Sequence, residues 1–199
     1  QSVARRQPAK LAAMESLFQT QSRAPLLIGG IPDKASRTVK YAIEIPGMLS
    51  FLAHNDVNAE VIGLDRFPEK DWPPVLVTHL AFQIMVGIGT LLALVGIVGL
   101  FLLWKKPALY FSKAFLFPLI FCLPLGFIGI EAGWTVTEVG RQPWIIYGLL
   151  RTSEALTPRP GVLATFFIYL ALYSFLILVV GFLLVRQTKL LHKELEAKR

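Results

Sequence analysis

The sequence predicts an all-α membrane protein in which three transmembrane helices follow a mostly irregular external segment. Three long apolar stretches predict the helices, and the Lys and Arg residues around them predict the orientation of the chain. Hydrophobic residues make up 54% of the chain and charged residues only 17%, whereas globular chains average about 25% charged residues. The net charge of +7 does not indicate nucleic-acid binding, because no basic run is interleaved with aromatic residues.

Residues 1–74 form the predicted external segment, which contains one short helix. Pro8 suits the first position of a helix, and Leu11, Met14 and Phe18 then fall on one face. Beyond this helix, prolines and glycines recur up to the Pro-Pro pair at 73–74, so no long regular element is expected. Loops of this length are uncommon unless they bind something, so we expect a binding site here.

The three apolar stretches cover residues 75–104, 114–139 and 162–185. The first and third contain no Asp, Glu, Lys or Arg, and all exceed the roughly 20 residues that a helix needs to cross a bilayer. The second is apolar as far as Ile130, includes Pro118 and Pro124, and continues past Glu131. Each stretch therefore predicts one transmembrane helix.

The basic residues between these stretches predict which ends are cytoplasmic. The connection between the first two helices and the tail at 186–199 are more basic than the loop at 140–160. The connection contains Lys105, Lys106 and Lys113, and the tail contains Arg186, Lys189, Lys193, Lys198 and Arg199. The loop contains Arg141, Arg151 and Arg159. By the positive-inside rule, the first connection and the tail are cytoplasmic. The external segment and the 140–160 loop then lie outside.

Two carboxylates, Glu131 and Glu138, fall within the second predicted helix. Ionisable groups inside a membrane are costly, so each is a candidate functional group. Seven residues apart, they return to nearly the same helical face. Spacing alone favours an ion pair between Glu138 and Arg141, three residues later, whereas Glu131 has no basic residue one turn away.

Met85 lies in the first predicted helix, where a methionine is either packing material or a haem axial ligand. His79 precedes it by six residues, about 120° around the helix, so the two are not expected to bind one metal. Gln83 is one turn from His79, and we expect these two to form a hydrogen bond. Spacing alone does not decide whether Met85 has a function.

Two further patterns have structural interpretations. Lys10 and Glu15 are five residues apart, which does not match a helical ion pair, so spacing favours a solvated face. Gly89, Ala93 and Gly96 recur on one face of the first predicted helix, and small residues of this kind allow helices to approach closely.

Three segments together resemble subunit I of the cytochrome bd-type quinol oxidases. They are the Gln-Pro-Ala-Lys-Leu-Ala-Ala-Met-Glu run at 7–15, the Ile-Met-Val triplet at 84–86, and the stretch from Trp134 through Glu138 to the Gly-Arg-Gln-Pro-Trp run at 140–144. The last run is highly specific, whereas the triplet is weak alone. The resemblance covers essentially the whole chain but only the C-terminal half of that subunit, so the three helices would belong to a larger helical bundle.

The resemblance implies that residues 1–74 are an external quinol-binding loop of the short type. Lys10 and Glu15 match residues of this loop that bind quinol, where a carboxylate takes protons from it. Many relatives have an arginine two residues before the methionine, where this chain has Gln83. A positive charge that would favour the reduced haem is therefore absent.

The resemblance also implies haem-binding roles in the helices. Met85 matches the axial ligand of haem b558, and Glu138 matches the ligand of the high-spin haem b595. Trp134 matches an aromatic beside haems b595 and d, and Arg141 is expected to hold a haem propionate. Glu131 would then be a second buried carboxyl on a proton route.

The implied function is that of a terminal respiratory oxidase in the bacterial cytoplasmic (inner) membrane. Quinol would be oxidised outside, and electrons would pass through haems b558, b595 and d to reduce oxygen to water. The chain would need the N-terminal half of subunit I, oxidase subunit II and membrane lipid, and no nucleic acid. Two alternatives are a membrane anchor or assembly subunit without haem, and a proton-coupled transporter using Glu131 and Glu138.

Overall fold

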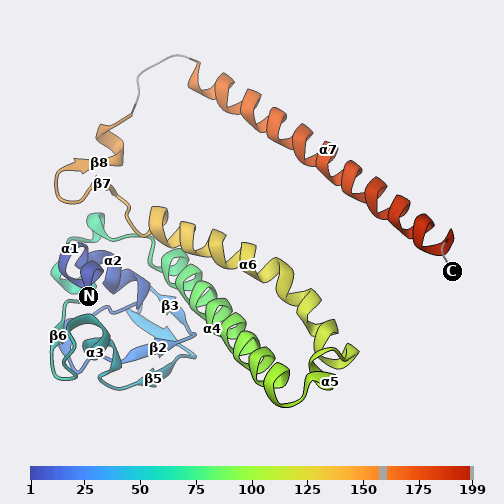
Figure 1. The fold of residues 1–199 in the computed structure, drawn as a ribbon. Coiled ribbons are helices and arrows are strands. Elements are labelled where there is room, and N and C mark those ends of the chain that lie inside the picture. Colours follow the sequence, from blue (N-terminus) through green and yellow to red (C-terminus); the bar gives the residue numbers. More distant parts are fainter. Residues whose placement is uncertain (157–160, 198–199) are drawn as a thin grey trace. The chain divides into compact units, whose positions relative to one another are not determined.

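The computed structural model describes residues 1–156 and 161–197, so Arg159, Lys198 and Arg199 of the orientation argument lie outside the described residues. The chain divides into two compact units, Gln1–Ala155 and Leu156–Arg199, and Figure 1 shows the elements of each. The first unit contains the external segment and two long helices. The second contains one long helix.

Among the described residues, three helices are long and apolar enough to cross a membrane, which confirms the predicted fold class. They are α4 (Val75–Lys105), α6 (Lys113–Val139) and α7 (Val162–Ala197). The first two match the predicted bounds to within one residue at each end. Helix α7 extends well beyond residue 185, so the predicted tail is largely helical.

Helices α4 and α6 form a hairpin through the short helix α5 (Pro107–Tyr110), as Figure 1 shows. The two helices approach closely at glycines of α6. A methyl group added at Gly133 would lie 3.0 Å from the Met85 sulfur, and one at Gly129 would lie 3.2 Å from Ile88. No described atom outside the local helix lies within 4 Å of such a group at Gly89 or Gly96, so the predicted small-residue stripe is not the α4–α6 contact.

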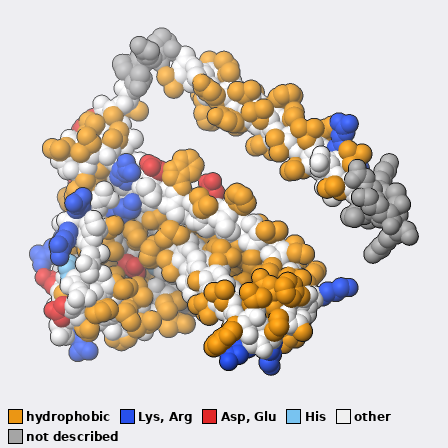
Figure 2. Space-filling view, in the orientation of Figure 1, with side chains coloured by type: hydrophobic (Ala, Val, Ile, Leu, Met, Phe, Trp, Pro, Cys, Tyr) orange, Lys and Arg blue, Asp and Glu red, His pale blue; other side chains and the backbone are white. Residues whose placement is uncertain are grey.

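The surface of this hairpin is largely hydrophobic along its length, with Lys and Arg side chains at the α5 end (Figure 2). The basic residues at this end are Lys105, Lys106 and Lys113. This separation of apolar and basic surface is what the positive-inside rule requires of a cytoplasmic turn. The orientation of the chain stays a prediction.

The external segment contains more regular structure than the sequence predicts. Its helices are α1 (Ser2–Arg6), α2 (Pro8–Met14) and α3 (Met48–His54), with 3-10 turns at η1 (Leu64–Arg66) and η2 (Glu69–Asp71). Three antiparallel pairs join β1 (Gln21–Ser22) to β6 (Glu60–Val61), β2 (Leu26–Ile28) to β5 (Ile43–Ile45), and β3 (Ile31–Asp33) to β4 (Thr38–Lys40). Strands this short carry no readable alternation, which is why only α2 is predicted.

A small apolar core holds the external segment together and against the start of α4. Its largest members are Leu17, Phe18, Leu49, Leu64 and Trp72. The Trp72 indole N–H donates to the Phe67 carbonyl at 2.9 Å, which fixes the ring just before α4 begins. The core therefore sets the position of α2 relative to α4.

The segment after α6 forms a second small hairpin that belongs to the first unit. Strand β7 (Trp144–Ile146) pairs with β8 (Leu150–Arg151), followed by the 3-10 turn η3 (Thr152–Glu154). Arg151 forms an ion pair with Asp71, just before α4, and its guanidinium carbon lies 4.6 Å from the Trp144 ring centroid. These contacts join the ends of α4 and α6 that lie away from α5.

Candidate functional site

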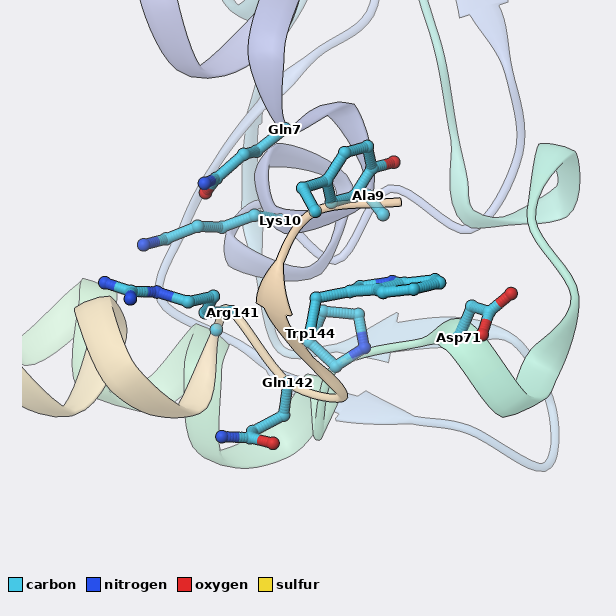
Figure 3. Close-up of a pocket in the computed structure, with 10 residues that line it drawn as sticks. Gln7, Ala9, Lys10, Asp71, Arg141, Gln142 and Trp144 are labelled. Atoms are coloured by element: carbon cyan, nitrogen blue, oxygen red, sulfur yellow. The ribbon is translucent and has the colours of Figure 1, made fainter. Parts of the chain in front are cut away.

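The ends of α4 and α6 away from α5 meet helix α2 at a small pocket, shown in Figure 3. Its lining includes Gln7 and Lys10 from the α2 region, Asp71 before α4, and Arg141 and Trp144 after α6. In Figure 3 the side chains of Gln7, Lys10 and Arg141 extend in the same direction on one side of the pocket, while Asp71 lies on the other. Residues predicted from two separate motifs therefore meet in one place.

Lys10 connects the external segment to the end of α6. Its Nζ donates to the Thr137 carbonyl oxygen at 3.3 Å, in the last turn of that helix. A lysine there satisfies a carbonyl that has no partner within the helix and complements the helix dipole. Burial lowers the pKa of Lys10, the nearby Arg141 lowers it further, and Glu138 raises it. The pKa of Lys10 therefore depends on both Glu138 and Arg141.

Glu15 is buried, with only 4% of its surface exposed. One carboxylate oxygen, Oε2, is buried without a hydrogen-bond partner among the described residues. Burial raises the pKa of Glu15 from 4.5 to about 7. The expectation of a solvated face is therefore wrong for Glu15, because the chain turns inward after α2 ends at Met14. A carboxyl with this pKa can both accept and release a proton near neutral pH.

The two carboxylates of α6 lie on its face away from α4. Glu131, Trp134 and Glu138 are exposed in the described unit, whereas Ala132 and Val136 on the other face are buried. Glu131 is therefore not a buried carboxyl within the described part of the chain. All three exposed side chains are free to contact a group that lies beside α6.

The predicted ion pair between Glu138 and Arg141 is confirmed, with 3.8 Å between Glu138 Oε1 and Arg141 Nη2. The Glu138 side chain stays 53% exposed, so this long contact leaves the carboxylate accessible. A carboxylate of this kind can serve as a ligand while the arginine holds a second anionic group. Both interpretations of Glu138 are therefore compatible with its geometry.

Met85 lies half-buried in α4, with its sulfur against Gly133 of α6. Because Gly133 has no side chain, space is kept beside the thioether at this crossing. Within the described residues, no three His, Cys, Asp or Glu side chains come together as metal ligands. The thioether, the exposed carboxylate and the neighbouring arginine are residue types that fit haem groups.

His79 and Gln83 do not form the hydrogen bond that their spacing predicts. Each instead binds backbone groups of the external segment: His79 contacts the carbonyls of Met14 and Gly29, and Gln83 contacts Leu27 and Gly29. No short-range pattern signals these partners, because they lie at least 50 residues away in the chain. The Asp71–Arg151 ion pair, across 80 residues, is missed for the same reason.

The fold and the site define a membrane protein in which residues 1–74 pack onto the ends of two candidate membrane-spanning helices and bring a buried carboxyl to them. The family model for cytochrome bd terminal oxidase subunit I matches residues 1–191. The chain belongs to this family, which confirms the resemblance that the sequence motifs indicate.

Curated relatives and a solved structure agree with this assignment. The putative cytochrome bd menaquinol oxidase subunit I of Bacillus subtilis (strain 168) is 44% identical over 176 residues, covering 85% of this chain and 38% of the relative. The cytochrome bd ubiquinol oxidase subunit 1 of the same organism is 31% identical over 196 residues, covering 92% and 42%. The bd oxidase structure from Geobacillus thermodenitrificans matches with a TM-score of 0.79 and 40% identity, covering 92% of this chain and 42% of that one. The chain thus spans about two fifths of the length of these relatives.

Proposed function

We propose that the chain forms the quinol-oxidising part, and part of the haem-binding region, of a bd-type quinol:oxygen oxidoreductase. The observation that carries the proposal is Glu15, a carboxyl buried at the end of α2 whose pKa is about 7. Oxidation of a quinol to a quinone releases two electrons and two protons. A buried carboxylate at the substrate takes one of these protons and passes it to the outer surface.

Lys10 positions the quinol site next to the haem side of the protein. Its ammonium group bonds to the last turn of α6 and lies near Glu138 and Arg141. This contact holds α2, and with it Glu15, against the end of α6. A donor group at this position can also bind an oxygen of the quinol.

The helices would hold three haems, which supply one-electron transfer and oxygen reduction when bound. Met85 would ligate haem b558 through its thioether, and Glu138 would ligate haem b595 through its carboxylate. Arg141 would pair with a propionate, and Trp134 would pack beside haems b595 and d. Glu131, on the same exposed face as Glu138, would belong to a proton route.

The complex would require the N-terminal half of subunit I and oxidase subunit II in the bacterial cytoplasmic membrane. The external segment would face outward and the C-terminus would face the cytoplasm. Two relatives are named for menaquinol and ubiquinol, so a quinol is the proposed substrate class. A membrane anchor without haem, one of the two alternatives, has no need of a buried carboxyl at Glu15.

A substitution of Lys10 tests the quinol part of this proposal. In the purified complex, we expect Lys10→Met to reduce quinol oxidation at least tenfold per haem while the haem content stays unchanged. Lys40→Met is the matched control, because Lys40 lies in the same segment, is exposed and pairs only with Asp33 among the described residues. Equal activity of Lys10→Met and wild type would contradict a quinol site at α2.

A further inference from the structure

Two side chains of helix α4, one turn apart, form hydrogen bonds with backbone groups of the external segment. His79 is fully buried, with Nδ1 2.8 Å from the Met14 carbonyl oxygen and Nε2 3.2 Å from that of Gly29. Gln83 accepts from the Gly29 N–H at 3.0 Å and donates to the Leu27 carbonyl at 2.8 Å. Gly29 is therefore bound through both of its backbone polar groups. We call these four contacts the α4 clamp.

Gln83 completes the free edge of strand β2. One edge of this strand pairs with β5, and the Leu27 carbonyl and Gly29 N–H project from the other edge. A carbonyl and the N–H two residues later point the same way in an extended strand, which matches the acceptor and donor of one amide group. Gly29 then turns the chain with φ +69, a left-handed conformation that other residues adopt with strain.

His79 contacts backbone groups of the external segment through both of its ring nitrogens. Both ring nitrogens face carbonyl oxygens, which only accept hydrogen bonds. The charged groups on elements packed against α4 are all at least partly exposed: Lys10, Asp33, Lys113, Glu131 and Glu138. Arg141, just after α6, is also partly exposed, whereas Glu15, just after α2, is buried. The Met14 carbonyl that His79 binds belongs to the peptide group that leads into Glu15.

We propose that His79 and Gln83 are positioning residues that fix Glu15 relative to the helix that carries Met85. The inference rests on the proposed function, in which Glu15 takes a quinol proton and Met85 ligates a haem. Gln83 lies two residues before Met85 and His79 six residues before it, so one rigid helix holds both the quinol side and the haem ligand. The clamp also gives Gln83 a role that an arginine cannot fill, because arginine has donors but no acceptor for the Gly29 N–H.

The test combines hydrogen exchange with kinetics on the purified oxidase complex. The variants are Gln83→Leu, which removes two contacts, and His79→Phe, which removes the other two. The milder Gln83→Glu and His79→Gln each keep one contact and serve if the first two assemble poorly. The matched control is Thr78→Val, because Thr78 is as buried as His79 but its hydroxyl has no hydrogen-bond partner among the described residues.

We expect faster amide exchange at residues 26–30 in the Gln83 variants and at both 10–16 and 26–30 in the His79 variants, by roughly 5- to 30-fold where two hydrogen bonds are lost. With decylubiquinol as substrate, KM per haem should rise by a similar factor in the same variants. The reduced-minus-oxidised haem spectrum should keep its amplitude. Thr78→Val should match the wild type in all three measurements.

Unchanged exchange and unchanged KM in the Gln83 and His79 variants of an active complex would overturn the clamp and leave the proposed function intact. Equal effects from Thr78→Val would also overturn it, because any buried change at that turn would then suffice. A different result would overturn the proposed function, and the positioning role with it. In that result the variants exchange faster than the wild type, but the wild-type complex neither binds haem nor oxidises quinol.

Discussion

Replacing Glu15 with glutamine should stabilise the external segment and, at the same time, abolish most of the quinol oxidation proposed for the complex. Folding raises the pKa of Glu15 from 4.5 to about 7, so the folded chain binds the proton more tightly than the unfolded chain does. Stability is therefore highest below pH 4.5 and falls as pH rises through 7. A shift of about 2.5 units corresponds to about 3 kcal/mol, to order of magnitude, when Glu15 is fully ionised.

Glutamine has nearly the same shape and no charge, so Glu15→Gln removes this cost. At pH 5 the amides of residues 8–16 should exchange at similar rates in the variant and the wild type. At pH 8 to 9 the variant should exchange more slowly, by up to about 100-fold if local opening exposes the carboxylate. Hydrogen exchange of the purified complex at matched pH measures this difference.

Activity should change in the opposite direction. If ionised Glu15 accepts the quinol proton, wild-type turnover rises between about pH 6 and 8 as the carboxylate forms. Glu15→Gln should lose most of this turnover and its dependence on pH in that range. The control is Glu44→Gln, since Glu44 is exposed in the same segment. A variant with wild-type turnover and an unchanged pH profile would refute the reasoning, as would equal exchange rates at pH 9.

Three further predictions concern the helices. Glu138→Gln should remove or shift the high-spin haem signal in the visible spectrum while the low-spin signal remains, because the proposed function assigns this carboxylate to the high-spin haem alone; an unchanged high-spin signal would contradict the assignment. Gln83→Arg should raise the potential of the haem proposed to bind Met85, because a positive charge near a haem favours its reduced form, as measured by redox titration; a lowered potential would contradict it. Gly133→Ala should shift the low-spin haem band, because the new methyl would lie 3.0 Å from the Met85 sulfur; Gly126→Ala, with nothing described within 4 Å outside the local helix, is the control.

The spanning helices could be predicted because the membrane imposes a local requirement on composition. A long stretch without charge, such as 75–104, has few other uses, so its bounds follow from the sequence alone. The Glu138–Arg141 contact could also be predicted from the sequence, because residues three apart on a helix are neighbours. In both cases the determining residues lie close together in the chain.

The part of the site that lies on the external segment could not be predicted in this way. The burial of Glu15 results from packing among α2, α4 and the apolar core, and no spacing within residues 7–15 encodes it. His79 and Gln83 form hydrogen bonds with backbone groups at least 50 residues away and not, as their spacing predicts, with each other. The spacing of Lys10 and Glu15 favours exposure to solvent, whereas the motif resemblance implies that both residues have a function. In the structure, Glu15 is buried.

The proposed function requires that this chain provides haem ligands in a quinol-oxidising complex. The most direct test is a reduced-minus-oxidised visible spectrum of the purified membrane complex, recorded for the wild type and for Glu138→Ala. We predict low-spin and high-spin b-type bands in the wild type, with the high-spin signal lost or shifted in the variant. An intact complex without haem bands would contradict the proposed function and would favour the anchor or the transporter.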